Sequence, residues 1–565
     1  KYFYNEQLQG RIKVLHIASV NAFIFKYFGD GKIFLHGQQI IPGNFYFFDE
    51  GAIIKGPKIT PIYYNDIAAA FFKSKTKTRI LFEGKDVEFH FKNSKNGIQN
   101  FNFKAESGEL IGIMGGSGVG KSTLLNVLNG KLPLSKGKIL INEFNLHRDK
   151  KTLEGVIGFI PQDDLLIEEL TVFQNMYYNA KLCFDNFSEQ QILKAISKVL
   201  TDLDLDDIKH LKVGSPLNKF ISGGQRKRLN IALELIREPS ILFVDEPTSG
   251  LSSADSENVM LLLKEQALKG KLVIVNIHQP SSSIFKLLDK LWILDKGGYP
   301  VYKGNPVDAV VYFKTMSSHV NANESECPVC GNVNPDQILQ IIEAKMVDDA
   351  GKYTNERKIK PKQWYKLYKK NIEKKEEEDE YFAPERKLPR NYFKIPDINK
   401  QFRIFSIRNL LSKLTDKQYL TVNLLEAPAL AFVLAYFTKY VTESGYIFSD
   451  NKNLPAYLFM SIVVALFMGL TVSAEEIIKD RKILERESFL NLSRFSYLNS
   501  KIVFLFILSA IQTGLYVLTG NSILEIKGML LSHWFILFTT ACWANMVGLN
   551  ISSGLNSVVT IYILI

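Results

Sequence analysis

The sequence contains a glycine-rich stretch whose residue types and spacing are suited to holding phosphate. Residues 115–122 read GGSGVGKS, which fits the pattern G-x-x-x-x-G-K-[ST] between the apolar runs LIGIMG and TLLNVL. Glycines there let backbone N–H groups point at phosphate oxygens at the positive end of a helix. We expect Lys121 to reach the terminal phosphates and Ser122 to ligate Mg²⁺. The residues of this predicted cradle are Gly115, Gly116, Ser117, Gly118, Val119, Gly120, Lys121, Ser122 and Thr123.

A second stretch, ISGGQRKRLNIALELI at residues 221–236, also places a hydroxyl and two glycines ahead of an amphipathic run. Ser222, Gly223, Gly224 and Gln225 therefore form a second candidate anion site, because a helix N-terminus with bare backbone attracts negative charge. The residues alone do not explain why one chain carries two such sites so far apart.

Four polar residues follow short apolar runs and are suited to phosphate cleavage. We expect Asp245 to hold Mg²⁺ through water and Glu246, the next residue, to polarise the attacking water. Gln162 is expected to bridge the metal and the surface that meets the membrane helices described below, and His278 to contact the terminal phosphate. The alternatives are a solvent-facing strand end for the two acids and a core position for the histidine. The position of each residue after a buried run favours the catalytic interpretation.

Residues 80–345 have the pattern of the domain that would position these side chains. LIGIMG, VIGFIPQ, ILFVDE, KLVIVNIH and LWILDKG are short apolar runs, several of which end on a polar residue. Buried parallel strands with active residues at their carboxyl ends have this pattern, so we predict an α/β domain.

Ahead of this domain, residues 11–72 alternate apolar and polar residues between turn signals, which predicts a small antiparallel all-β domain over residues 1–75. The domain resembles a forkhead-associated sandwich. The arginine, serine and histidine pattern with which that family reads phosphothreonine is not present, so we expect a structural or regulatory addition.

Residues 346–400 are rich in charge, including KKNIEKKEEEDE, and are predicted to form a solvated linker or helix face. Residues 401–420 are predicted to form an amphipathic connecting helix at a membrane surface. Its apolar face would hold Ile404, Ile407, Leu411 and Leu414, with Arg403, Arg408 and Lys413 elsewhere.

Residues 421–565 are predicted to be an α-helical transmembrane domain. Four apolar runs, each near the length of a bilayer-crossing helix, occupy about 424–441, 456–475, 502–520 and 529–550, and a fifth begins near 556. Core helices of a soluble protein are the alternative. The loop at 476–501 is rich in lysine and arginine, so we expect it, the nucleotide domain and the N-terminus to face the cytosol.

Composition narrows the class further. Hydrophobic residues make up 46% of the chain and aromatic residues 12%, which excludes a disordered protein. The net charge of +11 comes without a compact basic patch interleaved with aromatics, so we interpret it as cytosolic surface beside anionic lipid and expect no nucleic-acid partner. Four cysteines predict no disulfide framework. The first residue is lysine, so we expect a portion of a longer chain.

With these residues in view, the chain resembles the ATP-binding cassette (ABC) transporters, in which SGGQ at Ser222–Gln225 is the signature sequence. ISGGQRKRLNIALELIREPSILFVDEPTSGL and IHQPSSSIF resemble the G subfamily, the white or pleiotropic-drug-resistance type. VDAVVYF, NPDQILQIIE and GLTVSAEEIIKDRKILERESFLNLSRFSYL resemble its hinge and coupling segments. The resemblance covers residues 80–565.

The resemblance implies how the two anion sites work together. In the family, the cradle of one subunit and the signature of another close on the same ATP, so Ser222, Gly223 and Gly224 would contact the γ-phosphate held by a second chain's Lys121. It implies an ATP–Mg²⁺-dependent homodimeric half-transporter in an inner or plasma membrane, exporting a lipid or hydrophobic compound. Two alternatives stay open: an ATP-driven regulator that transmits force across the membrane, and a soluble ABC protein acting on ribosomes or DNA.

Other positions carry narrower hypotheses. The resemblance places Phe91 where an aromatic ring stacks on adenine; a core strand residue is the alternative. Ser252 stands where the family usually has aspartate, which predicts slower or asymmetric hydrolysis. Cys327 and Cys330 are half of a zinc ribbon without a second pair, so an ordinary thiol pair is favoured over zinc or redox roles. Acidic residues near the span ends are expected to act in anchoring or coupling: Glu426, Glu475 and Glu476.

Overall fold

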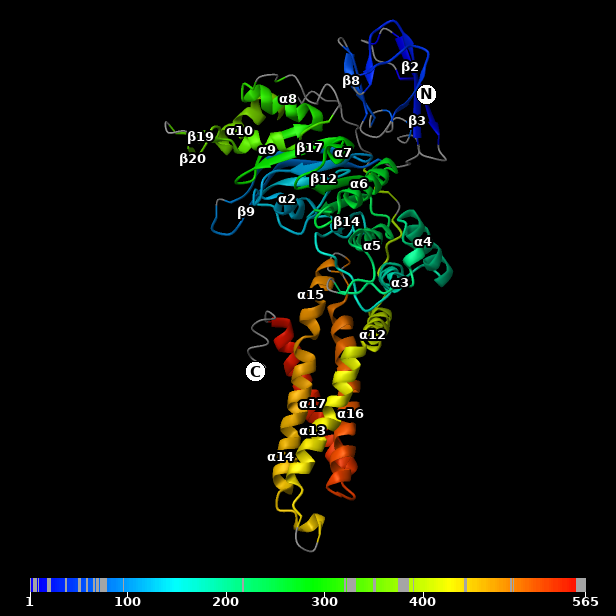
Figure 1. Ribbon diagram of the computed structural model, residues 1–565, viewed down its shortest axis with the longest axis vertical. Helices are drawn as coiled ribbons and strands as arrows, with labels where there is room; N and C mark the ends of the chain where they lie inside the picture. Colours follow the sequence, from blue (N-terminus) through cyan, green and yellow to red (C-terminus); the bar gives the residue numbers. More distant parts are fainter. Residues whose placement is uncertain are drawn as a thin grey trace. The chain divides into compact units, whose positions relative to one another are not determined.

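The computed structural model describes residues 2–3, 8, 10–17, 22–35, 38–48, 52–56, 59–64, 67, 71, 79–94, 96–215, 218–319, 322, 332–348, 352–373, 386–389, 391–441, 445–487, 490 and 492–554. These residues divide into two compact units. One unit comprises residues 1–164 and 223–392, and the other comprises residues 165–222 and 393–565. The described strands lie in the first unit, and the second unit is built of helices (Figure 1).

Two small antiparallel sheets form the N-terminal part of the first unit. Their strand orders are β1 (Tyr2–Phe3), β2 (Gly10–Ile17), β3 (Ala22–Gly29), β6 (Phe45–Phe48), and β5 (Gln38–Gln39), β4 (Phe34–Leu35), β7 (Ile53–Gly56), β8 (Ile59–Tyr63). Alternate residues such as Phe23 and Phe25 on β3 are buried in one core with Ile54 and Ile62 of the second sheet. The period-two pattern of the sequence thus produces the predicted small β domain.

A six-stranded, mainly parallel sheet forms the centre of the first unit. Its strands lie in the order β14 (Ile157–Ile160), β15 (Ile241–Asp245), β16 (Leu272–Asn276), β11 (Leu110–Met114), β17 (Lys290–Asp295), β18 (Tyr299–Gly304). β15, β16 and β11 are buried along their whole length, as expected for strands covered on both faces. The carboxyl ends of β15, β16 and β11 therefore meet at one edge of the sheet, where the loops carry the predicted site residues.

An antiparallel sheet and several helices complete the first unit. The sheet has the order β10 (Gly97–Glu106), β9 (Leu81–His90), β12 (Lys136–Ile141), β13 (Phe144–Asn145). The helices that bear on the site are α2 (Lys121–Leu128), α5 (Gly223–Leu235), α6 (Ser253–Leu268), α7 (Ser282–Leu287), α8 (Pro306–Met316) and α9 (Asp336–Glu343).

Part of the segment predicted as a charged linker, 346–400, is folded. β19 (Lys345–Val347) pairs with β20 (Tyr353–Arg357), and α10 (Pro361–Tyr368) and a short π-helical segment (Lys369–Glu373) follow. Trp364 and Tyr368 are both fully buried on α10. They lie four residues apart on one helix face, so a single apolar stripe anchors a segment whose average composition is polar.

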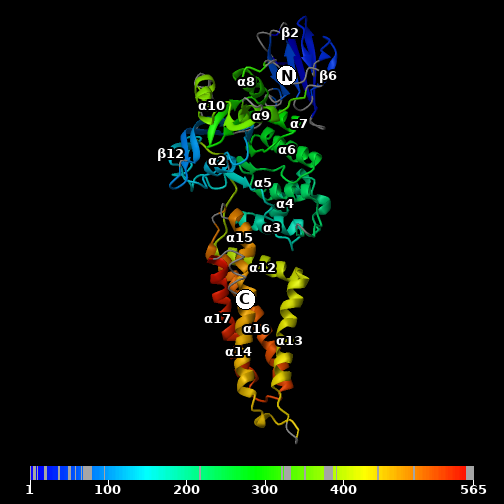
Figure 2. The ribbon, with the colours of Figure 1, turned by 60° about the vertical axis from the view of Figure 1, so that its left-hand side comes forward.

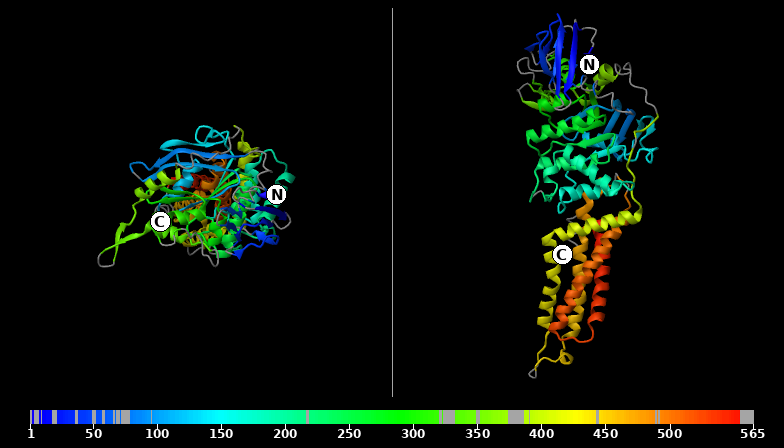
Figure 3. Two further views of the ribbon diagram at one scale, coloured as in Figure 1. Left: turned by 90° about the horizontal axis from the view of Figure 1, so that it is seen from above. Right: turned by 90° about the vertical axis from the view of Figure 1, so that its right-hand side faces the viewer.

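The second unit joins a helical part at 165–222 to a bundle of long helices. The helices are α3 (Val172–Cys183), α4 (Glu189–Asp202), α12 (Ile398–Thr415), α13 (Lys417–Thr438), α14 (Leu454–Ala474), α15 (Glu476–Glu487), α16 (Arg494–Ile523) and α17 (Leu530–Gly554). Figure 2 shows α13, α14, α16 and α17 running side by side, and α12 crosses the end of this bundle in the right-hand view of Figure 3.

Four helical stretches of the described residues are long and apolar enough to cross a membrane: Lys417–Thr438, Leu454–Glu487, Arg494–Ile523 and Leu530–Gly554. They correspond to the four predicted spans, and the predicted fifth span lies outside the described residues. Small residues bring the helices close: a Cβ on Gly469 of α14 would lie 2.7 Å from the Ala541 carbonyl oxygen of α17. Close backbone approach of this kind is typical of membrane helices.

Two segments differ from their predicted form. Residues 476–487 of the predicted loop are the helix α15, and the connecting helix runs over Ile398–Thr415 and is separated from α13 by Asp416. On α12 the apolar Ile407 and Leu414 are exposed, whereas Arg408 is buried and Lys413 is largely buried. The charges point inward because buried carboxylates are available to pair with them.

Candidate functional site

The glycine-rich loop lies between β11 and α2, and its path requires glycine. Gly118 and Gly120 have φ angles of 71° and 108°, in the left-handed region that side chains disfavour. A Cβ on Gly115 would lie 2.4 Å from the Leu294 carbonyl oxygen. Both constraints keep the backbone bare where a phosphate group would approach.

Lys121 places its ammonium group inside this loop. Its Nζ donates hydrogen bonds to the carbonyl oxygens of Gly115 at 2.9 Å and Gly116 at 3.0 Å. Burial lowers the pKa of Lys121, and the nearby carboxylates of Glu246 and Asp245 oppose that effect. Entering phosphate oxygens would take over hydrogen bonds that the loop carbonyls now accept.

Ser122, at the start of α2, forms a polar triangle with the buried Asp245 and Asn276 at the carboxyl ends of β15 and β16. The Ser122 hydroxyl donates to Asp245 Oδ1 at 3.2 Å, and Asn276 Nδ2 donates to Asp245 Oδ1 at 2.5 Å and to Ser122 Oγ at 3.3 Å. A hydroxyl and a carboxylate at this spacing are the oxygen ligands that Mg²⁺ prefers.

Glu246 and Gln162 face each other beside this triangle. Gln162 Nε2 donates to Glu246 Oε2 at 2.8 Å, and Lys227 Nζ donates to the Gln162 carbonyl oxygen at 2.6 Å. Glu246 has a φ of 42°, an unusual conformation for glutamate, and its N–H donates to the Asn276 carbonyl oxygen at 3.1 Å. Strained backbone at a polar cluster is typical of functional sites.

His278 and Phe91 are exposed near the ends of their strands. His278 lies two residues beyond β16, and Phe91 directly follows β9 with 47% of its surface exposed. Phe91 packs edge-to-face on Phe89 at 4.9 Å, which leaves a ring face open to a planar partner. The core-strand alternative for Phe91 does not fit this exposure.

The second predicted anion site begins α5. Ser222 is exposed, α5 starts at Gly223, and Gln225 is half-buried. Gly224 is buried, and a Cβ there would lie 2.5 Å from Asp255 Oδ1. A side chain at Gly224 would therefore have to displace the Asp255 carboxylate. The exposed Ser222 precedes bare backbone at the helix start.

Ser252, the departure from the family pattern, caps a helix. Its Oγ accepts a hydrogen bond from the Asp255 N–H at 3.1 Å and donates to Asp255 Oδ2 at 2.8 Å. The residue thus begins α6 and fixes the Asp255 carboxylate that lies against Gly224.

A buried charge cluster joins α12, α15 and α16 in the second unit. Glu476 accepts hydrogen bonds from Lys501 Nζ at 3.0 Å and from Lys413. Lys501 Nζ also lies 2.8 Å from Asp480 Oδ2, and Arg408 pairs with Glu487. Mutual pairing makes these buried charges tolerable in an apolar setting.

The helical part at 165–222 is bonded to the same elements. Arg486 Nη1 of α15 donates to the Leu165 carbonyl oxygen at 2.5 Å. Ser412 Oγ of α12 donates to Glu169 Oε2 at 2.9 Å, and Lys212 Nζ donates to the Thr415 carbonyl oxygen at 3.0 Å. Three hydrogen bonds thus tie this helical part to α12 and α15.

The three acidic candidates near the span ends differ in burial and in ion-pair partners. Glu476 is buried in the charge cluster, whereas Glu475 pairs with Lys479 at 2.9 Å where both side chains are largely exposed. Glu426 is partly buried on α13.

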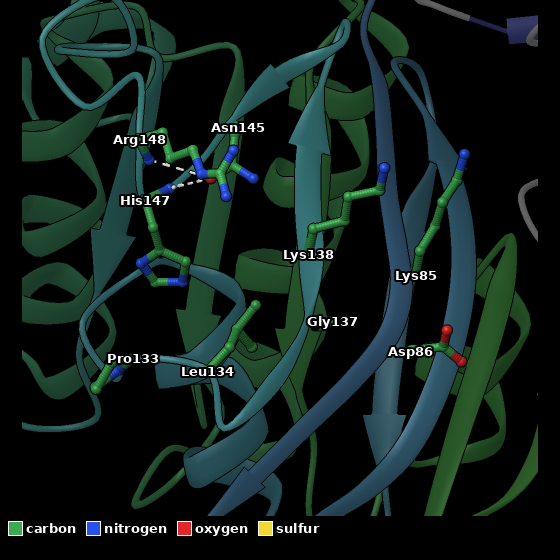
Figure 4. Close-up of a pocket in the computed structure, with 9 residues that line it drawn as sticks. All are labelled: Lys85, Asp86, Pro133, Leu134, Gly137, Lys138, Asn145, His147 and Arg148. Carbon is green, nitrogen blue, oxygen red and sulfur yellow. Dashed lines mark hydrogen bonds between the residues drawn. The ribbon is translucent and has the colours of Figure 1, made fainter.

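A cationic groove of about 640 Å³ lies on the antiparallel sheet of the first unit (Figure 4). Lys85 and Lys138 are register partners on β9 and β12, and Arg148 and His147 follow β13. None of the sequence-predicted site residues lines this groove.

Sequence reasoning missed Asn276, which connects Asp245 and Ser122. The available signal was a single polar residue inside the apolar run KLVIVNIH, because a fully buried amide requires partners. No group of three or more histidine, cysteine or acidic residues suited to a metal occurs among the described residues. Cys327 and Cys330 lie outside them.

Comparison with known proteins finds relatives of this chain. Residues 98–249 match the family described as "ABC transporter", and residues 278–387 and 400–565 match two families described as "ABC-2 type transporter". "ABC transporter G family member 28" of Arabidopsis thaliana is 37% identical over 217 residues, which cover 38% of this chain and 19% of that protein. "Protein white" of Ceratitis capitata is 31% identical over 392 residues, 65% of this chain and 54% of that protein.

The chain spans between 19% and 54% of the length of these two relatives. Among solved structures, cbiO1 from Clostridium perfringens, described as part of the ABC transporter complex cbiONQ, is 27% identical. That match covers 42% of this chain and 94% of cbiO1, with a TM-score of 0.37.

Proposed function

Because the chain belongs to the ABC transporters and its relatives are G-family members, we propose that it is a homodimeric half-transporter that uses ATP to export a lipid or other hydrophobic compound. The observation that carries the proposal is the set of contacts joining Ser122, Asp245, Glu246 and Gln162 at one sheet edge, with Lys121 beside them. The membrane is an inner or plasma membrane, with the nucleotide domain and N-terminus on the cytosolic side.

Each residue at this edge has a distinct task in hydrolysis. Lys121 and the loop N–H groups hold and orient the phosphates. Ser122 and Gln162 would hold Mg²⁺ through their side-chain oxygens and Asp245 would hold it through water, and the bound ion would supply positive charge against the phosphate oxygens. Glu246 orients the attacking water and accepts its proton, and His278 contacts the terminal phosphate. Phe91 stacks on the adenine.

The signature residues complete the site from a second copy. One chain contains one cradle and one SGGQ sequence, so two chains arranged head to tail contain two complete sites. Ser222, Gly223, Gly224 and Gln225 present a hydroxyl and N–H groups to the terminal phosphate bound by the partner. Closure on ATP then brings the two chains together.

Covalent continuity couples the site to the membrane helices. Leu165 follows Gln162 by three residues, and its carbonyl oxygen accepts the hydrogen bond from Arg486 of α15. Movement of Gln162 with the bound nucleotide is passed along this short stretch to α15, and through Glu169 to α12. Rigid helices then carry the displacement into the bundle.

A Glu246→Gln variant of the full chain tests the proposal. The amide keeps the side-chain volume but cannot take a proton from water, so steady-state ATP hydrolysis should fall at least about a hundredfold while ATP still binds. The variant should form a dimer with ATP that the parent protein forms only transiently, as measured by size-exclusion chromatography with light scattering.

An exposed carboxylate supplies the control: Glu238→Gln should hydrolyse ATP like the parent. Unchanged turnover in Glu246→Gln would contradict the catalytic assignment. A different result would contradict the assigned cargo alone. In that case Glu246→Gln loses ATP hydrolysis as expected, but the parent protein moves no fluorescent lipid in proteoliposomes.

A further inference from the structure

A small apolar cavity lies between the N-terminal halves of α14 and α17, at the end of the bundle away from α15. Its volume is about 230 Å³, and its lining includes Leu458 and Ile462 of α14 and Ile536 and Leu537 of α17. An apolar cavity of roughly 150 Å³ accommodates one benzene ring. This cavity therefore has room for a ring or a stretch of alkyl chain.

Two polar residues line this mainly apolar space: Ser532, which is exposed, and His533, which is buried. The histidine is 7% exposed, and its Nδ1 lies 3.1 Å from Asn521 Oδ1. In the orientation that the Asn521 amide has in this structure, its oxygen faces Nδ1 and accepts from the Nδ1–H tautomer. A neutral imidazole then presents a bare lone pair at Nε2, and this atom is buried without a hydrogen-bond partner.

An aromatic ring packs against the histidine. The Tyr457 ring lies edge-to-face on the His533 ring, with 6.0 Å between centroids. Leaving a buried polar atom such as His533 Nε2 unpaired is unfavourable, and a ligand that pairs with it recovers that free energy. The acceptor at His533 Nε2 specifically requires an O–H or N–H donor.

We propose that this cavity binds a hydroxyl-bearing lipid or amphiphile, whose O–H donates to His533 Nε2 and whose apolar part packs on Leu458, Ile462 and Ile536. An ether or ester of the same shape fits the walls but has no proton to donate. The site goes beyond the proposed function, because its occupancy requires neither ATP nor movement of the nucleotide domains.

Photolabelling of the nucleotide-free full chain in phosphatidylcholine nanodiscs tests the site. The probes are a diazirine-bearing dodecanol and its methyl ether, with labelled peptides identified by mass spectrometry. We expect the alcohol to label peptides containing Leu458–Ile462 and Met529–Leu537 about three- to tenfold more than the ether, the ratio that one hydrogen bond provides. Unlabelled dodecanol should compete.

Three variants separate recognition from misfolding. His533→Phe keeps a ring but removes the acceptor, so the two probes should label equally; His533→Gln keeps an acceptor and should retain a preference for the alcohol. Thr539→Val removes the hydroxyl of an exposed residue further along α17, outside the cavity lining, and should change nothing. Equal labelling by the two probes in the parent, labelling confined to other surfaces, or an unaltered preference in His533→Phe would overturn the proposal.

Discussion

Asn276 holds the carboxylate of Asp245 from a fully buried position, so its contribution is measurable. Asn276→Ala removes the donor to Asp245 Oδ1 and Ser122 Oγ but leaves every residue of the phosphate loop itself unchanged. Hydrogen bonds to charged groups contribute about 1.5–3 kcal/mol, so we expect turnover to fall roughly tenfold or more and the Mg²⁺ requirement to rise.

The ATPase rate as a function of Mg²⁺ concentration measures this effect, and the melting temperature reports folding. Asn276→Asp should impair turnover further, because it adds a second carboxylate beside Asp245. Equal activity in the parent and Asn276→Ala would show that Asp245 needs no such support.

Ser252 has a structural task that the family comparison alone does not suggest. Ser252→Ala removes the side-chain cap of α6, which should lower the free energy of unfolding by about 1 kcal/mol. Chemical denaturation followed by tryptophan fluorescence measures this change. Ser253→Ala is the matched control, because Ser253 is exposed one position later and provides no cap. A similar loss in both variants would contradict the capping role.

Ser252→Asp tests the hypothesis that serine at this position slows ATP hydrolysis or makes it asymmetric. Aspartate also caps helices, but here its carboxylate would stand beside that of Asp255, close to Gly224. We therefore expect α6 to persist while ATP turnover or its cooperativity changes, and unchanged values of both would discard a role for this position in hydrolysis.

At the scale of elements, the buried charge cluster joins three helices and is sensitive to the loss of one partner. Lys501→Met leaves the buried Glu476 and the partly exposed Asp480 with less compensation, so we expect marked destabilisation, of about 3–5 kcal/mol. Thermal unfolding of the detergent-solubilised protein measures it.

Two further variants are the controls for this prediction. Adding Glu476→Gln to Lys501→Met removes one orphaned carboxylate and should recover part of the lost stability. Lys479→Met disrupts the exposed pair with Glu475 and should be nearly neutral. If Lys501→Met unfolds at the same temperature as the parent, water must reach the charge cluster.

At the scale of the whole molecule, the proposed dimer predicts complementation between inactive chains. Lys121→Ala damages the cradle, and Gly224→Asp damages the signature because the new carboxylate would collide with that of Asp255. Each variant alone should be inactive. Co-expressed with different affinity tags and isolated as mixed dimers, they contain one intact site and should regain measurable ATP hydrolysis. Mixed dimers as inactive as either parent variant would contradict sites shared between chains.

Much of the candidate site was predictable because its determinants are local. The glycine spacing at 115–120 specifies a backbone path that other residues cannot follow, and the strand-end positions of Asp245 and Glu246 follow from apolar runs of strand length. Parallel strands in one sheet bring such ends to a common edge. The α/β domain, the small β domain and the apolar helices were likewise predictable from the spacing of apolar residues and the length of the apolar runs.

Only the tertiary structure decided which residues support that site and which charges are buried. Asn276, Lys501 and His533 look ordinary in the sequence, and the inward-facing Arg408 contradicts the simple expectation for a charged residue on an amphipathic helix. Arg408 and Glu487 are 79 positions apart, and Asn276 and Asp245 are 31 apart. Local patterns determine what an element is, whereas the burial of a polar group depends on partners that only the folded chain brings within hydrogen-bond distance.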